Sequence, residues 1–62
     1  MMEYGYILYT RKGYYIKGSR WVEFKSCLLH EEILRKLNTD KFFKVYDMMI
    51  HTDIISMLQV LS

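Results

Sequence analysis

The sequence predicts a single small α+β domain spanning residues 1–62. Aromatic and β-branched residues crowd the first 25 positions, with glycines between them, which is typical of antiparallel strands and tight turns. From residue 26 onward apolar residues recur at helical spacing instead. The chain has no proline, repeat or linker-like stretch, and its length leaves no room for a second domain.

The N-terminal half is expected to form a three-stranded antiparallel meander. Residues 4–10 are aromatic and branched and predict the first strand, which a turn with glycine at position 13 ends. Residues 14–17 predict the second strand. A reversal at Gly18 and Ser19 leads to the third strand, residues 21–25, in which apolar and charged side chains alternate.

A helix is predicted for residues 27–37. Ser26 is a suitable N-cap and Asn38 a suitable C-terminal stop. The apolar positions recur at i, i+4 and i+8 as Leu29, Ile33 and Leu37. Glutamates four positions before basic residues add favourable pairs along this helix.

The C-terminal third favours helix, with one alternative left open. Polar residues in the segment from residue 39 or 40 to 50 fall on one helical face, whereas its aromatic and branched residues favour a fourth strand at 41–50. We take the helix as the first choice. Asp53 is then expected to cap a last helical segment, whose apolar residues at helical spacing are Ile54, Met57, Leu58 and Leu61.

Composition and motifs exclude several classes of function. No apolar run approaches the roughly 20 residues that span a bilayer, and no export signal is evident, so a lone Cys27 fits a cytoplasmic protein. The sequence contains no glycine-rich phosphate loop and no catalytic, cofactor-binding or metal-ligand set. We expect a protein that is not an enzyme, with no cofactor, metal, small-molecule substrate or membrane partner.

The apolar content exceeds what so small a core can bury. Apolar and aromatic residues make up 52% of the chain, whereas a folded chain of this size buries only about 61% of its surface. The surplus predicts a partner protein, self-association into a homo-oligomer, or both. The residues expected at such an interface are Tyr9, Tyr15, Trp21, Met48, Met49, Ile54, Met57, Leu58 and Leu61.

The leading hypothesis is therefore a small protein-binding module. It would form homo-oligomers and inhibit or regulate a larger protein, as small proteins of viral or mobile-element type do. Its interface would draw on Tyr, Trp and Met side chains, which are common at protein interfaces.

An uneven charge distribution supports an alternative, a nucleic-acid-binding protein. Residues 1–26 carry five cations against two anions, and residues 27–62 carry four against five. The basic half also holds seven of the ten aromatic residues, and aromatic rings among cations are what single-stranded nucleic acid stacks on. The candidate contacts are Tyr4, Tyr6, Arg11, Lys12, Tyr14, Tyr15, Lys17, Arg20 and Trp21.

Overall fold

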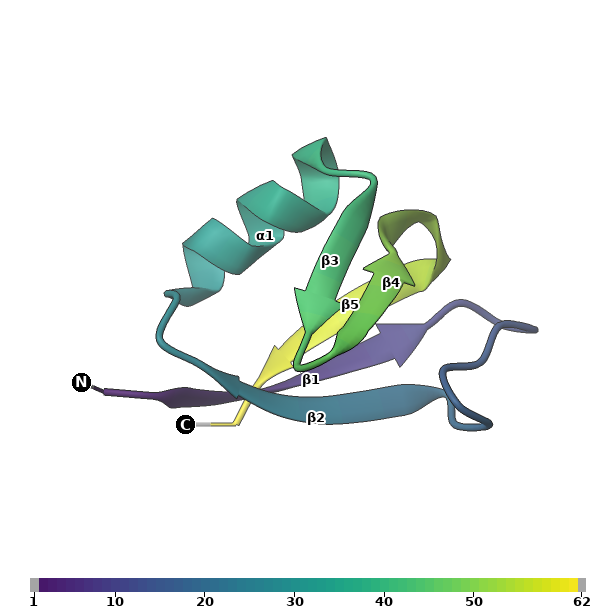
Figure 1. Ribbon diagram of the computed structural model, residues 1–62, viewed down its shortest axis with the longest axis horizontal. Coiled ribbons are helices and arrows are strands. Elements are labelled where there is room, and N and C mark those ends of the chain that lie inside the picture. The colour runs from purple at the N-terminus through teal and green to yellow at the C-terminus, as the bar shows by residue number, and fades with distance from the viewer. Residues whose placement is uncertain (1, 62) are drawn as a thin grey trace.

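A computed structural model describes residues 2–61 and confirms a mixed α+β protein. The elements in chain order are β1 (Tyr4–Thr10), β2 (Trp21–Ser26), α1 (His30–Thr39), β3 (Phe42–Val45), β4 (Met48–His51), the 3₁₀ turn η1 (Thr52–Ile54) and β5 (Ile55–Val60). Three strands form an antiparallel sheet in the order β2-β1-β5, and β3 and β4 form a separate hairpin. The helix and the hairpin both lie above the three-stranded sheet in Figure 1.

The predicted first and third strands are confirmed as β1 and β2, which pair with each other. The predicted second strand at residues 14–17 is wrong, and so is the order of the meander. Residues 11–20 form a loop, within which Ile16 and Ser19 exchange backbone hydrogen bonds of 2.7 and 2.9 Å. Both residues between them have positive φ, 50° at Lys17 and 81° at Gly18, so this tight turn lies one position before the expected reversal.

The predicted helix is present, shifted toward the C-terminus. α1 begins at His30 with Leu29 in the N-cap position, so Ser26 is not its cap. The Leu29 N–H donates to Glu32 Oε1 at 3.2 Å, and Ser26 Oγ instead accepts from the Leu28 N–H in the preceding loop. Ile33 is fully buried, as its place in the apolar spacing predicts.

The favoured helix over residues 39–50 is wrong, and the alternative of a strand comes closer. The segment forms two short strands joined by a turn at Tyr46 and Asp47. Side chains alternate across this hairpin, with Phe43 and Ile50 buried and Phe42 and His51 exposed on the other side. Among the polar residues at helical spacing, Lys44 and His51 lie on the exposed side of the hairpin strands. Asp47 falls in the turn between the strands and Asp40 precedes them, so the spacing does not reflect one helical face.

The predicted C-terminal helix is also wrong, because this segment forms β5. Its apolar spacing fits a helix, but the free edge of β1 offers backbone partners that local propensity does not record. The pairing with β1 has a bulge, where Ser56 is the extra residue between Ile55 and Met57. Ser56 Oγ donates toward the Tyr9 and Thr10 carbonyls, both at 3.2 Å, which holds the bulge in place.

A cluster of three aromatic rings connects the two sheets. The Tyr6 ring stacks on Phe24 at a centroid distance of 5.5 Å, and Phe24 meets Phe43 of the hairpin edge-on at 5.8 Å. The Tyr6 hydroxyl donates to the Leu28 carbonyl at 2.6 Å, just before the helix. Tyr6 thereby joins the sheet, the hairpin and the approach to α1. The buried apolar residues of this core are Tyr6, Leu8, Ile16, Phe24, Ile33, Phe43, Val45 and Ile50.

Replacement of Tyr6 by Phe tests this buried hydroxyl. Tyr6→Phe leaves the Leu28 carbonyl without its partner, so we expect the free energy of unfolding at pH 7 to fall by about 1 kcal/mol in urea titrations.

Burial raises the pKa of the Tyr6 hydroxyl above its ordinary value of 10.0, with Tyr4 and Glu32 adding to the effect. Above pH 10 the unfolded chain therefore loses the hydroxyl proton before the folded chain does. The free energy of unfolding consequently falls as pH rises.

The substitution should also weaken that alkaline loss of stability. Tyr6→Phe removes the titrating group while keeping the stacked ring, so its free energy of unfolding should depend less on pH above 10 than that of the wild type. Parallel alkaline curves for the two proteins would contradict this assignment.

Candidate functional site

Alternation along β1 divides the three-stranded sheet into two faces. Tyr6 and Leu8 point into the core, whereas Ile7 and Tyr9 point to the opposite side. The pairing places Trp21 of β2 and Met57 of β5 on either side of Tyr9. We call this side the outer face, which comprises Gly5, Ile7, Tyr9, Trp21, Glu23, Lys25, Met57, Gln59 and Leu61.

The outer face is apolar and uncovered by the described part of the chain. The helix and the hairpin lie on the other side of the sheet (Figure 1). Trp21 is 50% exposed, Met57 52% and Leu61 44%. Glu23 and Lys25 are the charged side chains on this face, so its formal charges cancel. Such a surface suits contact with another apolar surface.

Local hydrogen bonding and close packing order the outer face. The Tyr9 hydroxyl donates to Gln59 Oε1 at 2.6 Å, which fixes both side chains across β1 and β5. A Cβ added at Gly5 would lie 3.3 Å from Leu61 Cβ, so glycine here lets Leu61 lie close over β1. These contacts position Tyr9, Gln59 and Leu61 on the face.

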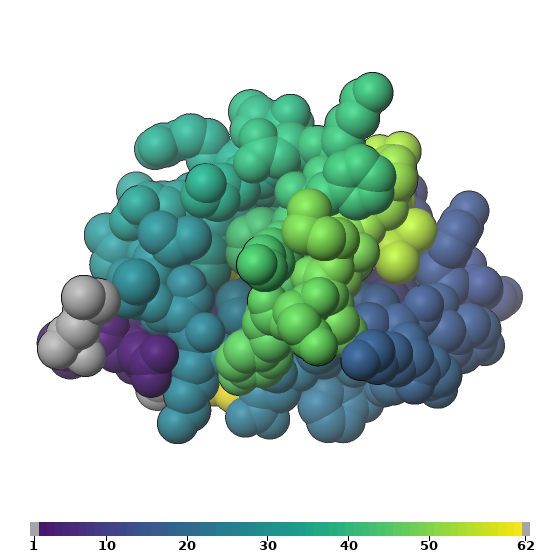
Figure 2. Space-filling view, in the orientation of Figure 1, coloured from purple at the N-terminus to yellow at the C-terminus, as the bar shows by residue number. Residues whose placement is uncertain are grey.

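A second apolar surface lies where the 11–20 loop meets the hairpin. It is a groove of about 350 Å³, which we call the β4 groove. Figure 2 shows the loop, in blue, beside the green hairpin. The groove is lined by Tyr15, Ile16, Lys17, Met48, Met49, Ile50, His51 and Ile54.

The nine predicted interface residues thus separate into distinct places. Tyr9, Trp21, Met57 and Leu61 lie together on the outer face. Four others line the β4 groove: Tyr15, Met48, Met49 and Ile54. Leu58 packs against the core and borders a groove between α1 and β5. Sequence reasoning missed Ile7, although its place between Tyr6 and Leu8 in the first strand puts it on the face of Tyr9.

The predicted nucleic-acid contacts also separate. Tyr6 is buried and Tyr4 packs against the core, so neither ring is free to stack on a base. Trp21 lies on the outer face. The other six, which we call the basic loop residues, fall within residues 11–20: Arg11, Lys12, Tyr14, Tyr15, Lys17 and Arg20.

The basic loop carries four cations and no acidic residue between positions 11 and 20. Tyr14 is 51% exposed and Tyr15 61%. The Arg20 guanidinium donates through Nη2 to the Thr10 carbonyl at 3.2 Å, and the buried Ile16 anchors the middle of the loop. This arrangement presents positive charge and two aromatic rings at one end of the sheet.

The described residues contain no group of three or more His, Cys, Asp or Glu side chains that could hold a metal ion. His51 Nδ1 accepts from the Asp53 N–H at 3.2 Å and caps η1, which accounts for the proximity of these two residues. Cys27 is exposed and lies in the loop that precedes α1.

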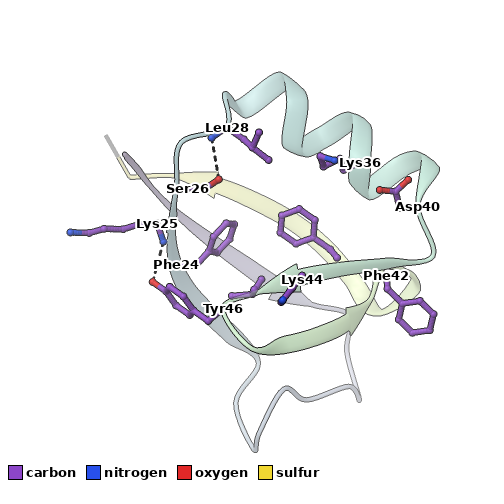
Figure 3. Close-up of a pocket in the computed structure, with 11 residues that line it drawn as sticks. Phe24, Lys25, Ser26, Leu28, Lys36, Asp40, Phe42, Lys44 and Tyr46 are labelled. Carbon is purple, nitrogen blue, oxygen red and sulfur yellow. Dashed lines mark hydrogen bonds between the residues drawn. The ribbon is translucent and has the colours of Figure 1, made fainter. Parts of the chain in front are cut away.

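A groove of about 250 Å³ lies between β2, the helix and β3 (Figure 3). The Lys25 N–H donates to Tyr46 Oη at 3.2 Å across its mouth. Figure 3 shows the side chains of Lys25 and Phe42 directed away from the groove, so these two groups do not face its interior. We therefore place the candidate site on the outer face and not here.

Comparison with protein-family models, with curated proteins and with solved structures finds no match. Among residues 2–61, no helix has the length and apolar character needed to cross a membrane. The function is therefore argued from the geometry of the chain.

Substitutions on the outer face should leave the fold intact. Trp21→Thr and Met57→Thr keep a strand-compatible residue at half-exposed positions, so we expect each to change the free energy of unfolding by less than about 1 kcal/mol. Leu8→Ala on the buried face should cost about 2 to 5 kcal/mol. Chemical denaturation measures all three, and comparable losses on both faces would show that the outer face serves folding instead.

Proposed function

We propose that this protein is a small protein-binding module that inhibits or regulates a larger protein through its outer face. The observation that carries the proposal is the row of Trp21, Tyr9 and Met57 across the three strands of an uncovered sheet. Tryptophan and tyrosine are enriched among the residues that dominate binding energy at protein interfaces. An apolar face on a β-sheet favours a folded partner with an apolar surface of its own.

The charge of the outer face supports a protein partner over nucleic acid. Phosphate backbones are bound by excess positive charge, whereas Glu23 and Lys25 cancel on this face. Glu23 and Gln59 lie on either side of Ile7, so polar groups able to form hydrogen bonds are interspersed with the apolar side chains of this face.

Affinity capture with a matched pair of variants tests this proposal. Trp21 and Phe42 are similarly exposed aromatic residues, at 50% and 48%, but Phe42 lies on the hairpin away from the outer face. From lysate of the source cell, we expect the wild type and Phe42→Thr to retain one protein in stoichiometric amount. The amount of that protein retained by Trp21→Thr should be at least tenfold lower. Nuclease treatment should leave the retained protein unchanged.

Two results would contradict the proposal. Retention that is equal for Trp21→Thr and Phe42→Thr would place binding elsewhere on the molecule. Retention that disappears after nuclease treatment would favour nucleic acid as the ligand.

The basic loop supports a second candidate function, binding of single-stranded nucleic acid. Four cations and two exposed tyrosines on ten residues combine phosphate contacts with stacking surfaces. The candidate contacts are now the six basic loop residues.

Salt titration of binding to a labelled single-stranded oligonucleotide tests this candidate. Lys12→Gln combined with Lys17→Gln should weaken binding and reduce the log-log salt slope by roughly 1 to 2, while Lys44→Gln on the hairpin should change neither. Fluorescence anisotropy gives both quantities. Absence of binding by the wild type at about 50 mM salt would exclude the candidate.

A further inference from the structure

β5 leaves one edge of the three-stranded sheet open. The Leu61 N–H donates to the Gly5 carbonyl at 2.9 Å, so the odd-numbered residues at this end of β5 direct their backbone groups to β1. Antiparallel alternation then turns the N–H and C=O groups of Leu58 and Val60 toward the open edge. In the strand order β2-β1-β5, no strand of the described chain lies beyond them.

Beyond the bulge at Ser56, the β5 edge has neither of two features that commonly prevent strands from pairing, a charged side chain and a proline. Its sequence is Ile-Ser-Met-Leu-Gln-Val. The opposite edge of the sheet is protected, because β2 carries Glu23 and Lys25 and the Lys25 N–H is already bonded to Tyr46 Oη. The hairpin strands are only four residues long. β5 is therefore the edge best suited to accept another strand.

We propose that β5 pairs antiparallel with β5 of a second copy of this chain, around a two-fold axis at Gln59. The two three-stranded sheets then join into one six-stranded sheet. The bulge at Ser56 sets the register, because it disturbs the strand before Met57 and leaves residues 57–61 as the regular segment. Gln59 is the centre of that segment.

This register brings like surfaces together. Leu58 lies opposite Val60 of the second copy on the core side, and Met57 lies opposite Leu61 of the second copy on the outer face. Gln59 meets its own counterpart, and since its Oε1 already accepts from Tyr9, its amide N–H groups remain to donate across the seam. The paired segment carries no charge, so the chain's net charge of +2 places no like charges in the seam.

The helix supplies a second layer of contact. A groove of about 330 Å³ separates α1 from β5, with Leu34, Leu37 and Leu58 in its lining. Leu34 is 38% exposed and Val60 43%, and a second β5 at this edge covers both. Because a two-fold contact uses the same edge of both copies, the assembly closes at two chains.

The expected dimer is a reversible one. A standard stable interface buries roughly 1,600 Å² of surface. Pairing of five residues per chain, with one row of helix contacts, buries less surface than that. We therefore expect dissociation in the micromolar range. Joining the sheets would also place two outer faces side by side on one continuous surface.

Sedimentation equilibrium in reducing buffer, over about 1 µM to 1 mM, tests the dimer. The wild type should approach twice the 7.6 kDa mass of the chain. Val60→Lys places a charge at the edge and should raise the dimer dissociation constant at least tenfold, whereas Met49→Lys, the same charge change on the exposed face of the hairpin, should alter it less than twofold. A wild type that remains monomeric, or a Val60→Lys variant that associates like the wild type, would overturn the proposal.

A cysteine substitution tests the register. Gln59 directs its backbone to β1, so across the seam it forms a non-hydrogen-bonded pair with Cα atoms about 4.5 Å apart, within disulfide range. In a Cys27→Ser background, Gln59→Cys should oxidise to a covalent dimer at least tenfold faster than Met57→Cys, whose counterpart lies four positions further along. Equal rates, or faster oxidation of Met57→Cys, would refute this register.

The dimer proposal and the protein-binding proposal are refuted by different results. Trp21 lies on β2, at the opposite edge from the seam, so Trp21→Thr should leave sedimentation unchanged. A strictly monomeric wild type would exclude the β5 seam while leaving partner capture through Trp21 untouched.

Discussion

The aromatic cluster of Tyr6, Phe24 and Phe43 is the interaction on which the fold depends. The β3–β4 hairpin is an isolated pair of four-residue strands, and such pairs are at best marginally stable in water. The Phe24–Phe43 contact places the hairpin on the larger sheet, and the Tyr6 hydroxyl ties the approach to α1 onto the same surface. Two sheets and one helix therefore share a single core.

That arrangement has a consequence for the other side of the sheet. Residues 2–61 form one α-helix and one separate hairpin, and both pack on the face of the sheet that carries Tyr6. The accessible surface is 4609 Å², somewhat above the roughly 4,300 Å² expected for a compact chain of this mass. Of the twelve large apolar side chains that are exposed in the described chain, six lie on the outer face, in the β4 groove or along β5: Tyr15, Trp21, Met49, Met57, Val60 and Leu61.

The sequence was sufficient where local pattern and final structure agree. The strands at 4–10 and 21–25 and the centre of the helix follow from alternation and spacing that tertiary contacts reinforce. The helix predicted for residues 55–60 was wrong because Met57 and Leu58 fit helical spacing, whereas the strand they form depends on pairing with β1, about fifty residues earlier. Four outer-face residues were predicted individually, but their convergence depends on that same long-range pairing.

Native-state hydrogen exchange tests the shared core most directly. Because the hairpin depends on the aromatic cluster, its slowest backbone amides, at residues such as Phe43 and Ile50, should exchange with the same free energy of opening as that of Leu8 in the central strand. Equal values would show one cooperative unit. Hairpin amides that open at a markedly lower free energy, while Leu8 stays protected, would contradict the account.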